Sequence, residues 1–273
     1  PPLLFYLQAL FYPLFGPVEW AARMPSFIVS LLLIPLTAQL TRRLTGDRTA
    51  AVIAALIVAV APLTVQFSAT AFSDPLLTFL ITAALYSVAR PRRTGAGSRT
   101  GSALTGILSG LALATKYQAL LFFPLMLVIG WLNGYRRGDW LRYLAGFAVV
   151  ASLVLAWQWV RPDAGLAVAL QWANIGGIRP AYSWELWRRL VDTVGLWRLA
   201  MGWPLIAAGA IAGVVYLLPG RRTIRSLSAD WIIVLFLLGY SVIHWLWAVP
   251  VWDRYLLPVF PLAAMLIGRA LST

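Results

Sequence analysis

Charge is what this 273-residue sequence most conspicuously lacks. Only 11% of its residues are charged, whereas an ordinary soluble domain carries roughly a quarter. Nine apolar stretches contain no Lys, Arg, Asp or Glu at all. They are residues 25–40, 50–67, 75–89, 102–115, 117–133, 143–160, 199–218, 231–251 and 255–268. Their lengths cluster around the ~20 residues that a helix needs to cross ~30 Å of hydrocarbon. The composition therefore excludes a water-soluble fold.

Strands of alternating polarity are also missing. Because backbone polar groups in lipid must be satisfied within the segment, helices are the natural spanning element. The sequence predicts an all-α fold, a polytopic transmembrane helical bundle of about nine spans that forms a single domain over residues 1–273. Residues 2–15 are apolar and aromatic but short, and Gly16-Pro17 follows them. We expect this segment to form an interfacial helix on the outer membrane surface.

Cysteine is absent and histidine occurs once. A disulfide framework and a thiolate metal site are therefore excluded. Lone His244, near the end of an apolar stretch, is more typical of a hydrogen-bonded packing residue than of a base. We expect no metal and no cofactor.

The basic residues, which give a net charge of +13, fall in alternate loops. Positive loops are sorted to the cytoplasm, so we assign 14 of the 22 basic residues to the inner side. They are Arg42, Arg43, Arg48, Arg90, Arg92, Arg93, Arg99, Arg136, Arg137, Arg142, Arg221, Arg222, Arg225 and Arg269. Three acids, Asp47, Asp139 and Asp230, share that side. This alternation explains the basic composition without a nucleic-acid partner, and the inner arginines would also attract anionic headgroups.

Two further features concern packing and loops. Gly106-x-x-x-Gly110 and Gly209-x-x-x-Gly213 permit close helix approach. Residues 161–198 form the only sizeable segment assigned to the extracytoplasmic side, and they mix tryptophan and tyrosine with charges. We expect an extracytoplasmic loop there, either a short interfacial helix or a lid.

The candidates for chemistry are the charges on the outer side. Asp74 stands at the start of an apolar stretch, in Ser73-Asp74-Pro75, where a helix N-terminus stabilises negative charge; a cap and a site role are both open. Lys116, the only lysine, lies in the short connection Thr115-Lys116-Tyr117. Its ammonium is suited to a phosphate at headgroup depth, or it snorkels to the interface.

A third group of outer charges precedes the last apolar stretch. The run from Val251 to Pro258 contains Asp253, Arg254 and Tyr255. Arginine binds phosphate in bidentate fashion. The alternative is a local cluster of Asp253 and Arg254 that anchors the helix end.

The order of several short motifs resembles a known family. These motifs are Pro1-Pro2-Leu3-Leu4-Phe5-Tyr6, Glu19-Trp20-Ala21-Ala22-Arg23-Met24-Pro25-Ser26, Thr41-Arg42-Arg43-Leu44, Ala71-Phe72-Ser73-Asp74-Pro75, Ala114-Thr115-Lys116-Tyr117 and Asp253-Arg254-Tyr255-Leu256-Leu257-Pro258. Together they resemble the glycosyltransferase family 39 and aminoarabinose-transferase group of the GT-C superfamily, which is dolichyl-phosphate-mannose-protein mannosyltransferase-like.

The resemblance implies a GT-C-like fold and an enzyme that moves a sugar from a polyprenyl-phosphate carrier to a glycan, lipid or protein acceptor at the extracytoplasmic face. It implies an integral, multi-pass protein of a prokaryotic plasma membrane. In this family the general base lies in the first extracytoplasmic loop, which follows a first span. Since the sequence opens on Pro1-Pro2 without an initiator methionine, we expect both to precede Pro1.

The family and the chemistry together assign roles to the outer residues. Displacement at the anomeric carbon needs a carboxylate to accept a proton and fixed cations to stabilise the departing phosphate. The predicted catalytic residues are Asp74 and Asp253, in acid or orienting roles. The predicted donor-phosphate ligands are Lys116, Arg254 and Arg23, and the predicted cavity-lining residues are Glu19, Tyr117 and Tyr255.

Two other classes of protein stay open. A polytopic secondary transporter also has many spans, but transporters usually bury ionisable groups near the bilayer midplane, and these stretches have almost none. A noncatalytic lipid-binding membrane subunit would share the fold. The sugar, the carrier, the acceptor and the oligomeric state are not encoded in any pattern we recognise.

Overall fold

The structure is a computed structural model of the chain. It describes residues 2–90, 96–160, 179–217, 224–247 and 251–272, with the side chains of 96–99, 204–205, 208–217 and 224–228 left undescribed. Within those ranges every regular element is a helix, and a single β-bridge joins Pro180 and Trp247. The predicted all-α class is confirmed.

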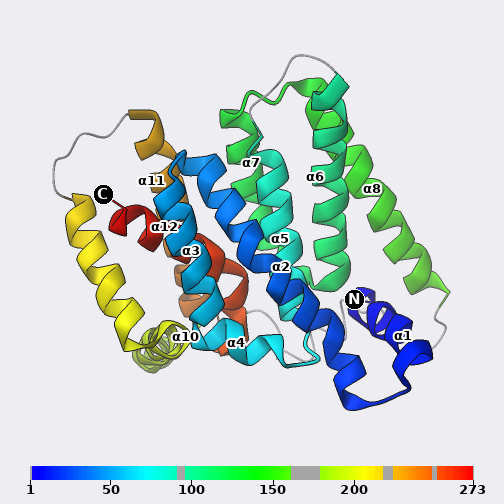
Figure 1. Cartoon of the computed structure of the whole chain (residues 1–273), viewed down its shortest axis with the longest axis horizontal. Helices are drawn as coiled ribbons and strands as arrows, with labels where there is room; N and C mark the ends of the chain where they lie inside the picture. Colours follow the sequence, from blue (N-terminus) through cyan, green and yellow to red (C-terminus); the bar gives the residue numbers. More distant parts are fainter. Residues whose placement is uncertain (1, 91–95, 161–178, 218–223, 248–250, 273) are drawn as a thin grey trace.

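The helices follow one another with short connections. In chain order they are α1 (Leu3–Phe15), α2 (Glu19–Thr45), α3 (Arg48–Val60), α4 (Pro62–Ser68), α5 (Asp74–Val88), α6 (Ala96–Thr115), η1 (Tyr117–Phe122), α7 (Phe123–Leu132), α8 (Arg137–Trp159), α10 (Ser183–Leu217), α11 (Ile224–Leu246), η2 (Asp253–Tyr255), η3 (Leu257–Val259) and α12 (Phe260–Leu271). Figure 1 shows α2, α3, α5, α6, α7 and α8 side by side, with α5 covered on several sides. Most of the α5 side chains are buried.

The bundle has two ends, separated by the length of α2. A helix of 27 residues is about 40 Å long. Near its beginning, the Ser26 hydroxyl donates to the Phe72 carbonyl just before α5; at its other end the chain turns into α3 at Asp47. We call these the Asp74 end and the Asp47 end.

Four helical segments are long and apolar enough to cross a membrane, and the bent pair of α3 and α4 would make a fifth. They are Glu19–Thr45, Arg137–Trp159, Ala229–Leu246 and Asp253–Leu271. The chain is thus a multi-pass membrane protein, but the described residues do not show nine full-length spans. The predicted stretches 75–89 and 117–133 do form helices, α5 of 15 residues and α7 of 10 residues. At 1.5 Å per residue, both are shorter than ~30 Å of hydrocarbon.

The stretch 50–67 is broken into two helices by its proline. Pro62 cannot continue the hydrogen bonding of α3, and it forces Ala61 into an extended conformation with ψ 134°. The chain bends by 56° between α3 and α4. In a continuous helix the Val58 carbonyl would accept from the N–H of residue 62, which proline lacks, and the Thr64 hydroxyl donates to it instead. As a result α4 runs across the Asp74 end instead of along the bundle (Figure 1).

The predicted loop 161–198 is partly helical. Residues 161–178 lie outside the described part, but α10 begins at Ser183, well before the predicted span at 199, and it is interrupted at Gly202, whose φ is 71°. The helix found before Gly202 is longer than the short helix predicted, and both the interfacial placement and the lid remain predictions. At its start, Arg179 makes two hydrogen bonds of 2.8 Å to Glu185. These bonds, together with the Tyr182 backbone N–H, lower the pKa of Glu185 to about 2.

The N-terminal segment forms the predicted helix, α1. The Gln8 side chain donates to the Ala22 carbonyl of α2, and the Trp157 indole donates to the Tyr6 hydroxyl at 2.8 Å. These two bonds fix α1 beside the beginning of α2 and the end of α8, as Figure 1 shows. That α1 lies on the membrane surface remains a prediction.

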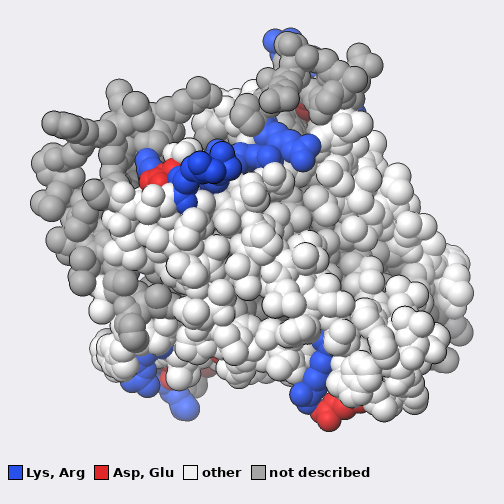
Figure 2. All heavy atoms as spheres, viewed as in Figure 1, with Lys and Arg blue, Asp and Glu red and all other residues white. Residues whose placement is uncertain are grey.

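Charged side chains gather at the two ends of the bundle. Figure 2 shows a row of basic side chains with some acidic ones along one edge of the molecule, smaller groups of both signs at the opposite edge, and a broad uncharged belt between them. A charge in hydrocarbon is costly, so this belt is the surface that lipid covers.

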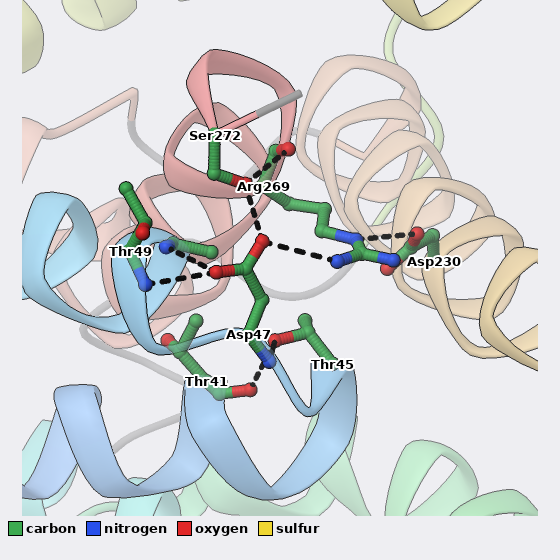
Figure 3. Close-up of polar contacts among 8 residues, drawn as sticks. Thr41, Thr45, Asp47, Thr49, Asp230, Arg269 and Ser272 are labelled. Atoms are coloured by element: carbon green, nitrogen blue, oxygen red, sulfur yellow. Dashed lines mark hydrogen bonds and ion pairs between the residues drawn. The ribbon is translucent and has the colours of Figure 1, made fainter. Parts of the chain in front are cut away.

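The charges at the Asp47 end form a cluster that joins three segments (Figure 3). Asp47 caps α3 by accepting from the Thr49 backbone N–H at 2.8 Å. Its other oxygen accepts from the Ser272 hydroxyl at 2.6 Å and from Arg269 at 3.3 Å, and Arg269 also lies 3.8 Å from Asp230. Burial by itself would raise the pKa of Asp47, but these hydrogen bonds and the Arg269 charge hold it below the usual value. The stabilisation is therefore present at neutral pH and is lost as the pH falls through that lowered pKa.

Glycine brings α6 and α8 into close contact. A Cβ at Gly106 would lie 1.9 Å from the Tyr143 carbonyl oxygen, and one at Gly110 would lie 2.7 Å from Val150 Cβ. The first predicted small-residue motif is therefore a helix-packing surface. The second motif, Gly209 and Gly213, lies in the part of α10 whose packing is outside the described set.

We expect Gly106→Ala to lower the apparent melting temperature in detergent, because the added methyl group must push α8 away from α6 at a cost of about 1–3 kcal/mol. Gly101→Ala on the same helix is the matched control, since nothing lies within 4 Å of its Cβ position. That change should be neutral or slightly stabilising. Equal melting temperatures for the two variants would contradict this packing.

Candidate functional site

The site at the Asp74 end begins with a buried carboxylate. Asp74 is the first residue of α5, and Pro75 follows it in the first turn, where a proline costs no hydrogen bond. The residue is only 1% exposed. Its charge is stabilised by the helix N-terminus and by Lys116, whose Nζ lies 2.6 Å from Asp74 Oδ1. The structure thus brings together two residues that are predicted separately from the sequence.

Lys116 reaches Asp74 because the chain is extended at that point. It has φ −163° and ψ 137° between the end of α6 and the start of η1. Its side chain is 21% exposed, and its Nζ lies 4.7 Å from the centroid of the Tyr255 ring. Burial lowers the pKa of Lys116, the Asp74 carboxylate opposes that shift, and the Arg254 charge adds to it.

Arg254 is held by aromatic rings. It lies in η2, and its Cζ is 3.9 Å from the Trp252 ring centroid and 5.7 Å from those of Phe72 and Tyr255. Its Nε is buried and has no hydrogen-bond partner among the described residues. No described carboxylate forms an ion pair with it either. Rings stabilise a cation without neutralising it, so the guanidinium keeps its charge for an incoming anion.

The other predicted residues divide into two groups. Tyr255 is buried and lies beside both cations, and Tyr117 starts η1 next to Lys116. Glu19 and Arg23 pair with each other on the first turn of α2 and are exposed. Arg23 therefore already has a carboxylate partner, unlike Arg254.

Asp253 has a local role in the structure. Its Oδ1 accepts from the Arg254 backbone N–H at 2.7 Å, which shapes the η2 turn. Through this contact, Asp253 helps to fix the position of Arg254. A catalytic role for Asp253 or Asp74 remains a prediction.

Two residues of the site have no prediction attached to them. Gln118 donates hydrogen bonds to the Tyr240 hydroxyl and to the Tyr255 carbonyl, and Tyr240 comes from α11, over a hundred residues further along the chain. A glutamine within an apolar stretch, two residues after the only lysine, is a signal that could have pointed to the first. Tyr240 carries no comparable signal. His244 stacks on Tyr240 with ring centroids 4.3 Å apart, which agrees with the packing role expected for it.

An apolar pocket of about 80 Å³ adjoins the charged groups. It lies between the first half of α2, the bend of α3 and α4, and the beginning of α5. Its lining residues are Phe27, Ser30, Leu31, Leu33, Ile34, Val58, Ala59, Thr64, Val65, Ser68, Pro75 and Leu257. Pro75 follows Asp74 directly and Leu257 is three residues after Arg254, so two of the lining residues are close in sequence to the charged groups. The described part of the chain contains no group of three or more His, Asp or Glu side chains placed to hold a metal ion.

This geometry can be set beside known proteins. Residues 1–160, more than half of the chain, match the family model of the dolichyl-phosphate-mannose-protein mannosyltransferases. The chain belongs to this family. The predicted resemblance to the GT-C membrane glycosyltransferases is thereby confirmed.

Two curated relatives are undecaprenyl phosphate-α-4-amino-4-deoxy-L-arabinose arabinosyl transferases. The one from Edwardsiella ictaluri is 29% identical over 149 residues, which are 54% of this chain and 27% of the relative. The one from an Enterobacter species is 24% identical over 157 residues, 57% of this chain and 28% of the relative. The matched part of this chain thus spans about a quarter of the length of each relative.

Solved structures share the fold over nearly the whole chain. ArnT from Cupriavidus metallidurans, bound to undecaprenyl phosphate, superposes with a TM-score of 0.67 and 19% identity, covering 99% of this chain and 49% of that one. The oligosaccharyltransferase of Archaeoglobus fulgidus, tethered to an acceptor peptide, superposes with a TM-score of 0.59 and 16% identity, covering 99% and 41%. At these identities the likeness concerns the fold alone, and that fold is GT-C-like.

We expect Lys116→Met to destabilise the protein by about 3 kcal/mol, because Asp74 would keep a buried charge without its cation. The double variant Asp74→Leu/Lys116→Met should recover most of that loss, since no charge is then left unpaired. Thermal unfolding in detergent measures both effects. Arg23→Met is the control, because its partner Glu19 is 79% exposed and should lose little. A double variant as unstable as Lys116→Met would show that the pair does not behave as a buried unit.

Proposed function

We propose that the protein is an integral membrane glycosyltransferase that moves a sugar from a polyprenyl-phosphate carrier to an acceptor at the extracytoplasmic face. The observation that carries this proposal is Arg254. A guanidinium held by three rings, with no described carboxylate partner, lies beside Lys116 and next to an apolar pocket. Such a site suits a ligand that joins a phosphate to a long apolar chain.

The cations would act on the leaving group. In the reaction, an acceptor oxygen forms a bond to the anomeric carbon while the bond between that carbon and the phosphate oxygen breaks. The bonding electron pair leaves with the phosphate, and the acceptor's proton passes to a carboxylate base. Arg254 and Lys116 would stabilise the charge that develops on the departing phosphate. Fixed cations are effective here because they need no reorientation during the reaction.

The two acids would have orienting roles. Asp74 already binds Lys116 at 2.6 Å, so we assign it the task of aiming the ammonium. Asp253 holds the backbone of η2 and thereby the direction of Arg254. Neither assignment gives the base.

Binding of the carrier tests the proposal without requiring turnover. In lipid nanodiscs the protein should bind undecaprenyl phosphate more tightly than the neutral alcohol undecaprenol. Arg254→Gln should weaken phosphate binding about tenfold to a hundredfold, the range expected for a lost charge-assisted hydrogen bond, and should leave undecaprenol binding unchanged. Native mass spectrometry can measure both.

Arg179→Gln provides the matched control, because this arginine already has Glu185 as a partner. Equal affinity for the phosphate and the alcohol would contradict the proposal. Phosphate binding without sugar transfer, in membranes supplied with a polyprenyl-phosphate sugar and acceptors, would favour the noncatalytic lipid-binding subunit.

The pH dependence of carrier binding follows from Lys116. Only the ammonium form attracts phosphate, and burial lowers its pKa. Affinity for the carrier should therefore be full at neutral pH. As the pH rises, the affinity should decline at a lower pH than the ~10.4 at which an ordinary lysine loses its proton. Binding titrations between pH 7 and 10.5 measure this. Lys116→Arg should remove the decline, and an unchanged decline in that variant would assign the titration to another group.

A further inference from the structure

The loops that carry the two cations are joined by a buried triangle of hydrogen bonds. The Tyr240 hydroxyl donates to the Tyr255 carbonyl at 2.6 Å. The Gln118 amide nitrogen donates to the Tyr240 hydroxyl and, at 3.3 Å, to the same carbonyl. Three elements that are distant in sequence, η1, α11 and η2, thus meet at one point.

The proton count fixes how this triangle is arranged. A tyrosine hydroxyl has one proton, and Tyr240 gives it to the Tyr255 carbonyl, which can only accept. The hydroxyl must therefore accept from Gln118, so the amide nitrogen faces inward. Gln118 Oε1 is then turned away, and it is buried without a partner among the described residues.

The position of the triangle relates it to phosphate binding. Gln118 is two residues after Lys116, and Tyr255 is the residue after Arg254. Lys116 is already held by Asp74. Arg254, in contrast, has no carboxylate partner among the described residues; the neighbouring rings, the Tyr255 hydroxyl and the turn of its own backbone hold it. The triangle adds a polar link between that turn and the segment that carries Lys116.

We propose that Gln118 and Tyr240 are positioning residues that hold Arg254 and Lys116 at the separation needed to bind one phosphate group together. This rests on the proposed function, because it assumes that the two cations share an anionic ligand. A preorganised pair of cations binds more tightly because the ordering is already present in the free protein. Without the triangle, η2 would be free to shift relative to η1.

The first test is removal of each hydrogen bond. Tyr240→Phe keeps the ring, which packs against Phe122 with centroids 5.7 Å apart, and loses only the hydroxyl. Gln118→Leu keeps the approximate side-chain volume and loses the amide. Each variant should bind undecaprenyl phosphate about fivefold to tenfold more weakly and should bind undecaprenol as the unaltered protein does. Tyr143→Phe is the matched control, since it removes a buried hydroxyl on α8 and should leave phosphate affinity unchanged.

A double-mutant cycle separates positioning from general support of the fold. If the triangle acts through Arg254, Tyr240→Phe should weaken binding less than twofold when Arg254→Gln is already present. A purely structural role would give the same fold-loss in both backgrounds, and that result would overturn the proposal. So would unchanged phosphate affinity in both Tyr240→Phe and Gln118→Leu.

The outcomes keep this proposal distinct from the proposed function. If the unaltered protein binds undecaprenyl phosphate and undecaprenol equally, the function fails and the positioning role fails with it. If the phosphate preference is present and Arg254→Gln removes it, the function stands whatever the triangle variants do. Should Tyr240→Phe melt below the assay temperature, Gln118→Leu alone decides, because it leaves the bond from Tyr240 to the Tyr255 carbonyl in place.

Discussion

The exclusion of charge from hydrocarbon is the constraint on which the rest of this structure depends. Because a charged group near the bilayer centre is costly, every ionisable side chain has to lie near one end of the bundle or the other. That requirement produces two compact polar clusters, one around Asp47 and one around Asp74. Within each cluster, residues that are far apart in the sequence contact one another. Asp47 meets residues more than two hundred positions away, and Lys116 meets Asp74 across 42.

The two clusters differ in how their cations are compensated. At the Asp47 end, Arg269 lies between two carboxylates, Asp47 and Asp230, so its positive charge is already balanced. At the Asp74 end, Lys116 has one carboxylate and Arg254 is compensated by rings. A ring quadrupole stabilises a cation by roughly 0.5–2 kcal/mol and adds no negative charge, so the first cluster is suited to anchoring helices and the second to binding an anion.

Sequence reasoning found the charged members of the site because a charge stands out in an apolar chain. Asp74, Lys116 and Arg254 are conspicuous among uncharged neighbours, and the structure brings them to one end of the bundle. The same reasoning could not separate Arg254 from Arg23. Whether an arginine already has a partner depends on the adjacent turns of its helix. Glu19 lies four residues before Arg23, on the same face, and pairs with it.

Gln118 and Tyr240 were missed for a related reason. Tyr240 resembles any other aromatic residue in an apolar stretch, and only tertiary packing shows that its hydroxyl meets Gln118 and the Tyr255 carbonyl. The breaks within apolar stretches were not predicted because hydropathy records where charge is absent, not where hydrogen bonding stops. Ala61 and Gly202 interrupt apolar segments without changing their hydropathy, one through the following proline and the other through a positive φ.

The breaks that hydropathy misses are also what create the site. A straight continuation of α3 through Pro62 would carry the chain past the end of the bundle, whereas the bend lays α4 across it and closes one wall of the apolar pocket. Lys116 likewise interrupts the helical chain between α6 and η1. Its backbone is extended there, so that its ammonium can turn back to Asp74. Uninterrupted spans of full length would place these groups farther apart. The departures from regular helix therefore bring an apolar pocket and two cations to the same end of the protein.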